Sequence, residues 1–274
     1  MAIAANTSPV ERIVRWAARL MTGIALAYLV LPLAAIVPLS FTSGTILVFP
    51  LPGWSLRWYA DFFENPLWTS ALARSVAIAL VTMAVATALG TTAALGLHGA
   101  RFRGKALIVG LLVAPMAVPV IITAVALFYW LSALGLVGSY AGLVCGHTVI
   151  ALPYVVITVL AALQGLDPSL PRAAAMLGAA PLEAFRRVTL PMIWPGVAAG
   201  ALFAFCASFD ELVITLFIAS PQQRTLPRQI FSGVSEAVTP TVTAAAVVLG
   251  IVSIGFMLAT ELLRRRAARQ RGVS

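Results

Sequence analysis

The sequence predicts an all-α membrane protein with six transmembrane helices, and three observations lead to this fold class. Of the 274 residues, 61% are hydrophobic and only 10% are charged, whereas soluble domains carry about 25% charged residues. The apolar residues gather in long runs, as a bilayer-spanning helix of roughly 20 residues requires. The basic residues stand at the ends of these runs, which accounts for the net charge of +9 without nucleic acid as a partner. We therefore expect one transmembrane domain covering residues 1–274.

Six apolar runs define the expected spans, and the lipid bilayer is their solvent. They are Ala17–Phe41, Leu72–Leu97, Ala106–Leu134, Val137–Leu163, Met192–Ser220 and Val242–Leu263. Backbone polar groups in hydrocarbon must pair internally, and the alternating pattern of a barrel is absent, so the spans are helices. The first run follows a basic start, but it is too long for the apolar core of a signal peptide, which favours a retained helix.

The distribution of basic residues predicts the orientation of the chain. Fourteen of the 18 Lys and Arg residues lie on one side of the six spans: Arg12, Arg15, Arg19, Arg101, Arg103, Lys105, Arg172, Arg186, Arg187, Arg264, Arg265, Arg266, Arg269 and Arg271. The positive-inside rule makes this side cytoplasmic. Both termini then lie in the cytoplasm, as an even number of spans requires, and the protein is a multi-pass protein of the bacterial inner membrane.

The segment after the first span, Thr42–Thr69, is expected outside. It holds six aromatic residues typical of a membrane interface: Trp54, Trp58, Tyr59, Phe62, Phe63 and Trp68.

The inner loop of residues 164–191 is longer than a plain connector. Asp167 can cap a short helix that begins at Pro168, and Gly178 can end it in a left-handed conformation. Pro181 suits the first turn of a second helix, which Pro191 separates from the next span. We expect two short helices across the cytoplasmic face, with a small alanine surface on which another protein can dock.

This loop resembles the signature loop of ABC importer permeases, which reads Glu-Ala-Ala, three residues, Gly, nine residues, Ile, one residue, Leu-Pro. The residues that fall on the pattern are Ala173, Ala174, Gly178, Val188, Leu190 and Pro191. Arg172 stands where the signature has Glu, so the contact made by that carboxylate is inverted and needs an acidic or neutral partner. The resemblance implies a type I importer bundle in which residues 164–191 dock in a groove of an ATPase subunit.

The resemblance also implies the remaining partners. They are a second homologous permease, an ATPase dimer and a periplasmic substrate-binding protein. ATP and magnesium would be bound by the ATPase and no cofactor by this chain. ATP would close the ATPase dimer, move the loop helices and switch the bundle from inward-facing to outward-facing.

One stretch imitates a nucleotide site. Gly99–Lys105 matches the first seven positions of a phosphate-binding loop, but Ala106 stands where a Ser or Thr must ligate magnesium, and a membrane helix replaces the preceding strand. A basic turn between two spans explains the segment. No catalytic or metal-binding constellation is found, so the chain is not expected to be an enzyme on its own.

The fifth span carries two acidic residues, Asp210 and Glu211, past its middle. A carboxylate at the centre of a membrane helix costs roughly 2.5–3.5 kcal/mol and normally faces a cavity or a partner. Either residue could attract a cationic substrate, or form a structural contact with another helix. Four aromatic residues are further pathway candidates through cation–π contacts, with packing as the alternative: Tyr129, Trp130, Tyr154 and Phe209. His147 is better explained by a helix–helix hydrogen bond than by a metal site.

Three stretches narrow the resemblance to the spermidine/putrescine branch: Ser55–Tyr59, His147–Tyr154 and Ser208–Leu212. The acidic pair suits a polycation, so polyamine import is the leading interpretation. Importers of ferric iron, aminoethylphosphonate or another small solute stay open as alternatives. A stand-alone secondary transporter is the competing class, and it would have no need of the loop helices.

Overall fold

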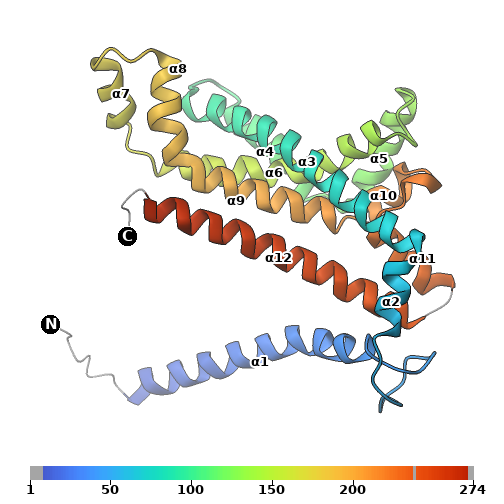
Figure 1. Ribbon diagram of the computed structural model, residues 1–274. Helices are drawn as coiled ribbons and strands as arrows, with labels where there is room; N and C mark the ends of the chain where they lie inside the picture. The colour runs from blue at the N-terminus through green and yellow to red at the C-terminus, as the bar shows by residue number, and fades with distance from the viewer. Residues whose placement is uncertain (1–8, 237–238, 271–274) are drawn as a thin grey trace.

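The computed structural model describes residues 9–236 and 239–270, and within them the side chains of residues 10–236 and 239–262. These residues form a chain of helices joined by short loops (Figure 1). The long helices are α1 (Pro9–Leu39), α3 (Pro66–Gly99), α5 (Val120–Ala133), α6 (Tyr140–Gln164), α9 (Leu190–Phe209) and α12 (Pro240–Gln270). The shorter helices are α2 (Arg57–Glu64), α4 (Lys105–Val113), α7 (Ser169–Met176), α8 (Pro181–Ala184), α10 (Val213–Ile218) and α11 (Leu226–Glu236).

Five of the described helices are long and apolar enough to cross a membrane, and the number is six when the bent pair α4 and α5 is counted as one span. With that pair counted as one, the number equals the six apolar runs of the sequence. The part of the basic tail at Arg271 lies outside the described residues.

The third span is not the single helix Ala106–Leu134 that the sequence predicted. It consists of α4, a 3-10 turn at Ala114–Met116, and α5, with a bend of 104°. Two prolines explain the bend. Pro115 lies in the turn and Pro119 precedes α5 in an extended conformation, and neither has an N–H to continue a helix. Neighbouring α6 packs against this bend.

The centre of the molecule is the packing of α3, α6 and α9 against one another. Small residues allow the close approach. A Cβ added at Gly200 would lie 2.9 Å from the Val155 Cα of α6, and one at Gly196 would lie 2.9 Å from the Thr158 carbonyl oxygen. Gly196 and Gly200 form a G-x-x-x-G motif, which brings membrane helices into contact without side chains between them. This motif was not predicted to hold α6 and α9 together, although it is present in the sequence.

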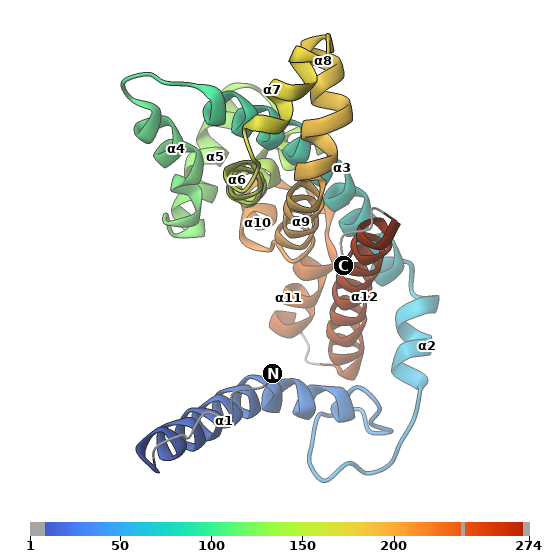
Figure 2. The ribbon, with the colours of Figure 1, turned by 90° about the vertical axis from the view of Figure 1, so that its left-hand side faces the viewer.

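The first helix, α1, stands apart from this bundle. In both views it runs away from the other helices and approaches them only near its C-terminal end (Figures 1 and 2). The most apolar window of α1 has no buried residue, and α12 is the main helix that it contacts. Its apolar surface is therefore available to lipid or to another subunit.

The aromatic segment after α1 is partly a core element, contrary to the interface role predicted for it. Phe62 on α2 and Trp68 on α3 are buried with Leu226 and Val242. The Thr241 hydroxyl donates to an Asp61 carboxylate oxygen at 2.6 Å, which ties α2 to α12. Trp54 and Phe63 are exposed, as the interface prediction requires.

The two ends of the bundle are formed by different helices. The short helices α7 and α8 lie at one end, together with the start of α1 and the end of α12 (Figure 1). The opposite end carries α2, α10 and α11 (Figure 1). The candidate coupling loop and the acidic residues of the fifth span are therefore separated by the length of α9.

Candidate substrate pathway and coupling segment

The acidic residues lie at a break in the fifth span. The sequence predicted one helix from Met192 to Ser220, but α9 ends at Phe209 and α10 begins at Val213. Asp210 and Glu211 therefore do not lie on a continuous helix. We call residues 210–212 the acidic break. Irregular backbone at membrane depth is tolerated where protein or a water-filled cavity satisfies it.

A buried histidine holds the two sides of this break together. His147 on α6 is fully buried, its Nδ1 lies 2.8 Å from the Ser208 hydroxyl and its Nε2 lies 3.1 Å from the Thr215 hydroxyl. Ser208 is on α9 and Thr215 is on α10. One side chain thus joins three helices, which confirms the predicted helix–helix hydrogen bond.

The two acids have different surroundings. The Glu211 carboxylate accepts a hydrogen bond of 2.8 Å from the Ile214 backbone N–H, and so satisfies a free donor in the first turn of α10. The Glu211 carbonyl accepts from the Thr215 hydroxyl at 3.2 Å. Asp210 is exposed, and its carboxylate accepts no hydrogen bond and forms no ion pair with any described residue. Glu211 therefore stabilises the break, whereas the Asp210 carboxylate is exposed and open to groups from outside the chain.

Tyr154 is the aromatic candidate that stacks on a ring of α9. It lies half-buried on α6, and its ring centroid is 6.1 Å from that of Phe203. Phe203 is exposed and lies seven residues before Asp210, about two helical turns along the same stripe of α9. Phe203 was not among the predicted pathway residues, although its spacing from Asp210 can be read from the sequence.

The other aromatic candidates are not gathered at the acidic break. Phe209 is buried and stacks on Phe205, which itself stacks on Phe256 of α12, so Phe209 packs in the core. Tyr129 and Trp130 are exposed on α5, and Trp130 lines a groove at the bend between α4 and α5.

The coupling segment, residues 164–191, has the two expected short helices. Asp167 accepts a hydrogen bond of 2.8 Å from the Ser169 N–H at the start of α7, and this bond lowers the pKa of Asp167. Gly178 follows α7 with φ of +87°, the left-handed conformation that favours glycine. Pro181 occupies the first turn of α8.

The second helix does not end before the membrane span. Pro191 was expected to separate the two, but α8, a π-helical turn at Phe185–Thr189 and α9 form one helix of 29 residues, Pro181–Phe209. Pro191 lies in the first turn of α9, where a missing N–H is tolerated. The coupling segment is therefore joined to the acidic break without an interruption.

The surface of the coupling segment suits a partner. Met176, Leu177 and Leu182 are exposed, and a concavity of about 260 Å³ opens between the two helices beside Ala174, Gly178 and Val188. Ala173 is exposed, whereas Leu190 and Pro191 are half-buried.

Among the described residues, charged side chains of the coupling segment form hydrogen bonds and ion pairs only with other residues of this segment. Arg172 donates to the Pro168 carbonyl oxygen at 3.0 Å, and Arg187 forms an exposed ion pair of 3.2 Å with Glu183. In the described part of the chain, no three His, Cys, Asp or Glu residues are grouped to hold a metal ion.

Comparison with known proteins decides the family. Residues 86–269 match the family described as binding-protein-dependent transport system inner membrane component. The chain belongs to this family. It is thus an ABC importer permease, a multi-pass protein of the inner membrane, and the ATPase of the transporter is a separate subunit.

Two relatives and one solved structure extend this finding over most of the permease. The spermidine/putrescine transport system permease protein PotC of Escherichia coli K12 is 33% identical over 239 residues, 87% of this chain and 90% of PotC. The putrescine transport system permease protein PotI of the same organism is 37% identical over 252 residues, 89% of each chain. A bacterial ABC transporter that imports the polysaccharide alginate has a chain with a TM-score of 0.75, 16% identity and coverage of 94% and 97%. The last likeness shows the fold of the permease.

Proposed function

We propose that this permease forms half of the translocation pathway of an ATP-driven polyamine importer, with spermidine or putrescine as the solute. The observation that carries the proposal is the free carboxylate of Asp210 at the acidic break. The names of PotC and PotI support the solute class. A cationic solute suits an exposed acid inside a membrane span.

The pathway residues divide by role. Asp210 meets an amine of the solute, and the stacked pair Tyr154 and Phe203 offers ring faces about two turns further along α9. Glu211 and His147 position the acidic break and do not contact the solute. Tyr129 and Trp130 are secondary candidates at the neighbouring α5.

The assembly is proposed on the same basis. The partners are a second homologous permease, an ATPase dimer and a periplasmic binding protein, and the structure of a related transporter with a periplasmic protein supports the last of these. ATP and magnesium are bound by the ATPase. The concentration of basic residues at the end with α7 and α8 supports a cytoplasmic position for that end and for both termini.

The coupling mechanism follows from the continuous helix. Residues 164–191 dock on the ATPase, with Ala173, Ala174, Gly178 and Val188 as the contact surface. A 29-residue helix measures about 43 Å, so movement of α8 is carried through Leu190 and Pro191 to Asp210. Close contact with α6 at Gly196 and Gly200 makes both helices move together.

The test is ATP-dependent uptake of labelled spermidine and putrescine by the reconstituted complex. Asp210→Asn is expected to lower uptake several-fold while assembly and basal ATP hydrolysis stay normal. Glu211→Gln keeps a carbonyl oxygen that can accept from Ile214, so its effect is expected to be small. Glu64→Gln, which removes an exposed acid of α2 outside the acidic break, is the matched control.

Three results would contradict the proposal. Normal uptake by Asp210→Asn would remove the pathway role of this acid. Equal losses for Asp210→Asn and Glu64→Gln would indicate a general charge effect. Absence of polyamine uptake by the wild type, with uptake of another solute, would overturn the solute class.

A further inference from the structure

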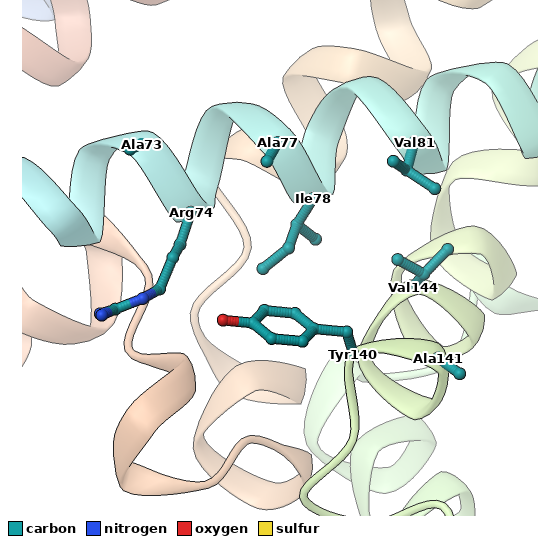
Figure 3. A pocket seen from close by; sticks show the side chains of 8 residues that line it. All are labelled: Ala73, Arg74, Ala77, Ile78, Val81, Tyr140, Ala141 and Val144. Atoms are coloured by element: carbon teal, nitrogen blue, oxygen red, sulfur yellow. The ribbon is translucent and has the colours of Figure 1, made fainter.

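A groove between α3 and α6 combines an apolar wall with a basic end. It has a volume of about 610 Å³. Alanine and aliphatic side chains line most of it, and Arg74 and Tyr140 are its only polar side chains. Figure 3 shows Arg74 and the Tyr140 ring toward one end, with Val81 and Val144 toward the other, and the Tyr140 hydroxyl directed toward the side of Arg74.

Arg74 lacks a protein partner at this position. Among the described residues its guanidinium forms no hydrogen bond and no ion pair, and the side chain is half-buried within a helix that spans the membrane. Charged side chains in such helices normally pair. An anionic group from outside the chain would complete the site.

The depth of Arg74 fits a lipid headgroup. With 34 residues α3 measures about 51 Å, so a helix of this length that is centred upright on a hydrocarbon core of about 30 Å extends about 10 Å beyond each side. Arg74 is the ninth residue of α3, about 12 Å from its start, and therefore lies at the boundary of the hydrocarbon. Tyr140 is the first residue of α6, where a tyrosine at a membrane interface is expected.

We propose that this groove binds an anionic phospholipid. The phosphate group accepts hydrogen bonds from the Arg74 guanidinium and the Tyr140 hydroxyl. One acyl chain lies along Ala77, Val81 and Val144 toward the membrane centre. The site lies at the end opposite α7 and α8, in the outer leaflet under the proposed orientation. It is separate from the solute pathway, because Arg74 repels a polycation and the wall offers no carboxylate.

The experiment uses the full chain in its complex, reconstituted in nanodiscs of phosphatidylcholine with a few per cent of phosphatidylglycerol that carries a photoactivatable acyl chain. After illumination, mass spectrometry locates the attached lipid. We expect labelling of peptides that contain residues 73–81 and 140–144. Photoactivatable phosphatidylcholine at the same fraction is expected to label them several-fold less.

Two variants and a control make the test specific. Arg74→Gln removes the charge and keeps the groove, and it should abolish the preference for phosphatidylglycerol. Ala77→Trp fills the groove and keeps Arg74, and it should lower labelling by both lipids. Arg57→Gln, at an exposed arginine that already contacts Trp58 and the Ser43 carbonyl, should leave labelling unchanged.

Either of two results would overturn the proposal. The first is equal labelling by the two lipids that Arg74→Gln does not change. The second is efficient cross-linking of Ala77→Cys to the second permease without lipid labelling, which would make the groove a subunit interface. Neither result bears on the polyamine pathway, because uptake is not the readout.

Discussion

The two ends of the helix Pro181–Phe209 are built in opposite ways. At the coupling end, α7 and α8 expose Met176, Leu177 and Leu182, and the charged groups bond only to their own segment. At the acidic break, buried His147 joins three helices. One end therefore leaves apolar side chains uncovered by the rest of the chain, whereas the other is held in place by hydrogen bonds within the chain.

α6 and α9 are in close contact at Gly200. Of the substitutions considered, Gly200→Leu is expected to lower the free energy of unfolding most. The new side chain meets the Val155 backbone and Thr158, which cannot move without separating the helices. We expect a loss of about 3 kcal/mol in the free energy of unfolding, measured in detergent by chemical denaturation. Gly250→Leu on α12, where an added Cβ meets nothing within 4 Å, is the control. Equal stability of both variants would contradict the close packing.

Loss of the hydrogen bonds of His147 is expected to have the second-largest effect on the free energy of unfolding. His147→Leu leaves the hydroxyls of Ser208 and Thr215 without this partner, and we expect a loss of about 1–2 kcal/mol. Because the break loses its position, the KM for uptake should rise as well. His147→Asn should recover part of the loss, since its amide can reach one of the two hydroxyls. An unchanged KM together with lowered stability would limit His147 to a folding role.

Substitution at the coupling end should have the smallest effect on stability of the three. Arg187→Ala removes an exposed ion pair with Glu183, which is worth less than about 0.5 kcal/mol. Thermal unfolding of the chain should be almost unchanged. Association with the ATPase, followed by co-purification, is where this variant should differ from wild type. A large fall in unfolding temperature would mean that this end is also fixed within the chain.

Hydropathy predicted where the apolar spans lie along the chain, because long apolar runs depend little on tertiary contacts, but it did not predict most of the helix ends. The predicted run Val242–Leu263 lies within α12, and Leu72–Leu97 lies within α3. Gly178 was also readable, since its left-handed conformation depends on local backbone chemistry alone.

The features that were predicted wrongly depend on contacts between helices that are distant in the sequence. Nothing near Asp210 is a proline or glycine, so a break after Phe209 could not be read from local breakers. It depends on Glu211 capping α10 and on His147, which lies 61 residues before Ser208 in the sequence. The bend at Pro115 and Pro119 was within reach of the sequence, but its angle of 104° depends on packing against α6.

If one unbroken helix carries movement from the coupling segment to Asp210, loosening this helix should lower the ratio of polyamine uptake to ATP hydrolysis. In the π-helical turn, Val188→Gly with Thr189→Gly loosens the helix by about 1 kcal/mol per residue, whereas Val188→Ala with Thr189→Ala removes the same side chains and keeps it stiff. Both pairs remove the Val188 side chain from the proposed contact surface, so the comparison is between the two pairs. Continuous transmission predicts uptake per ATP several-fold lower for the glycine pair than for the alanine pair. Equal ratios for the two pairs would contradict transmission along the helix.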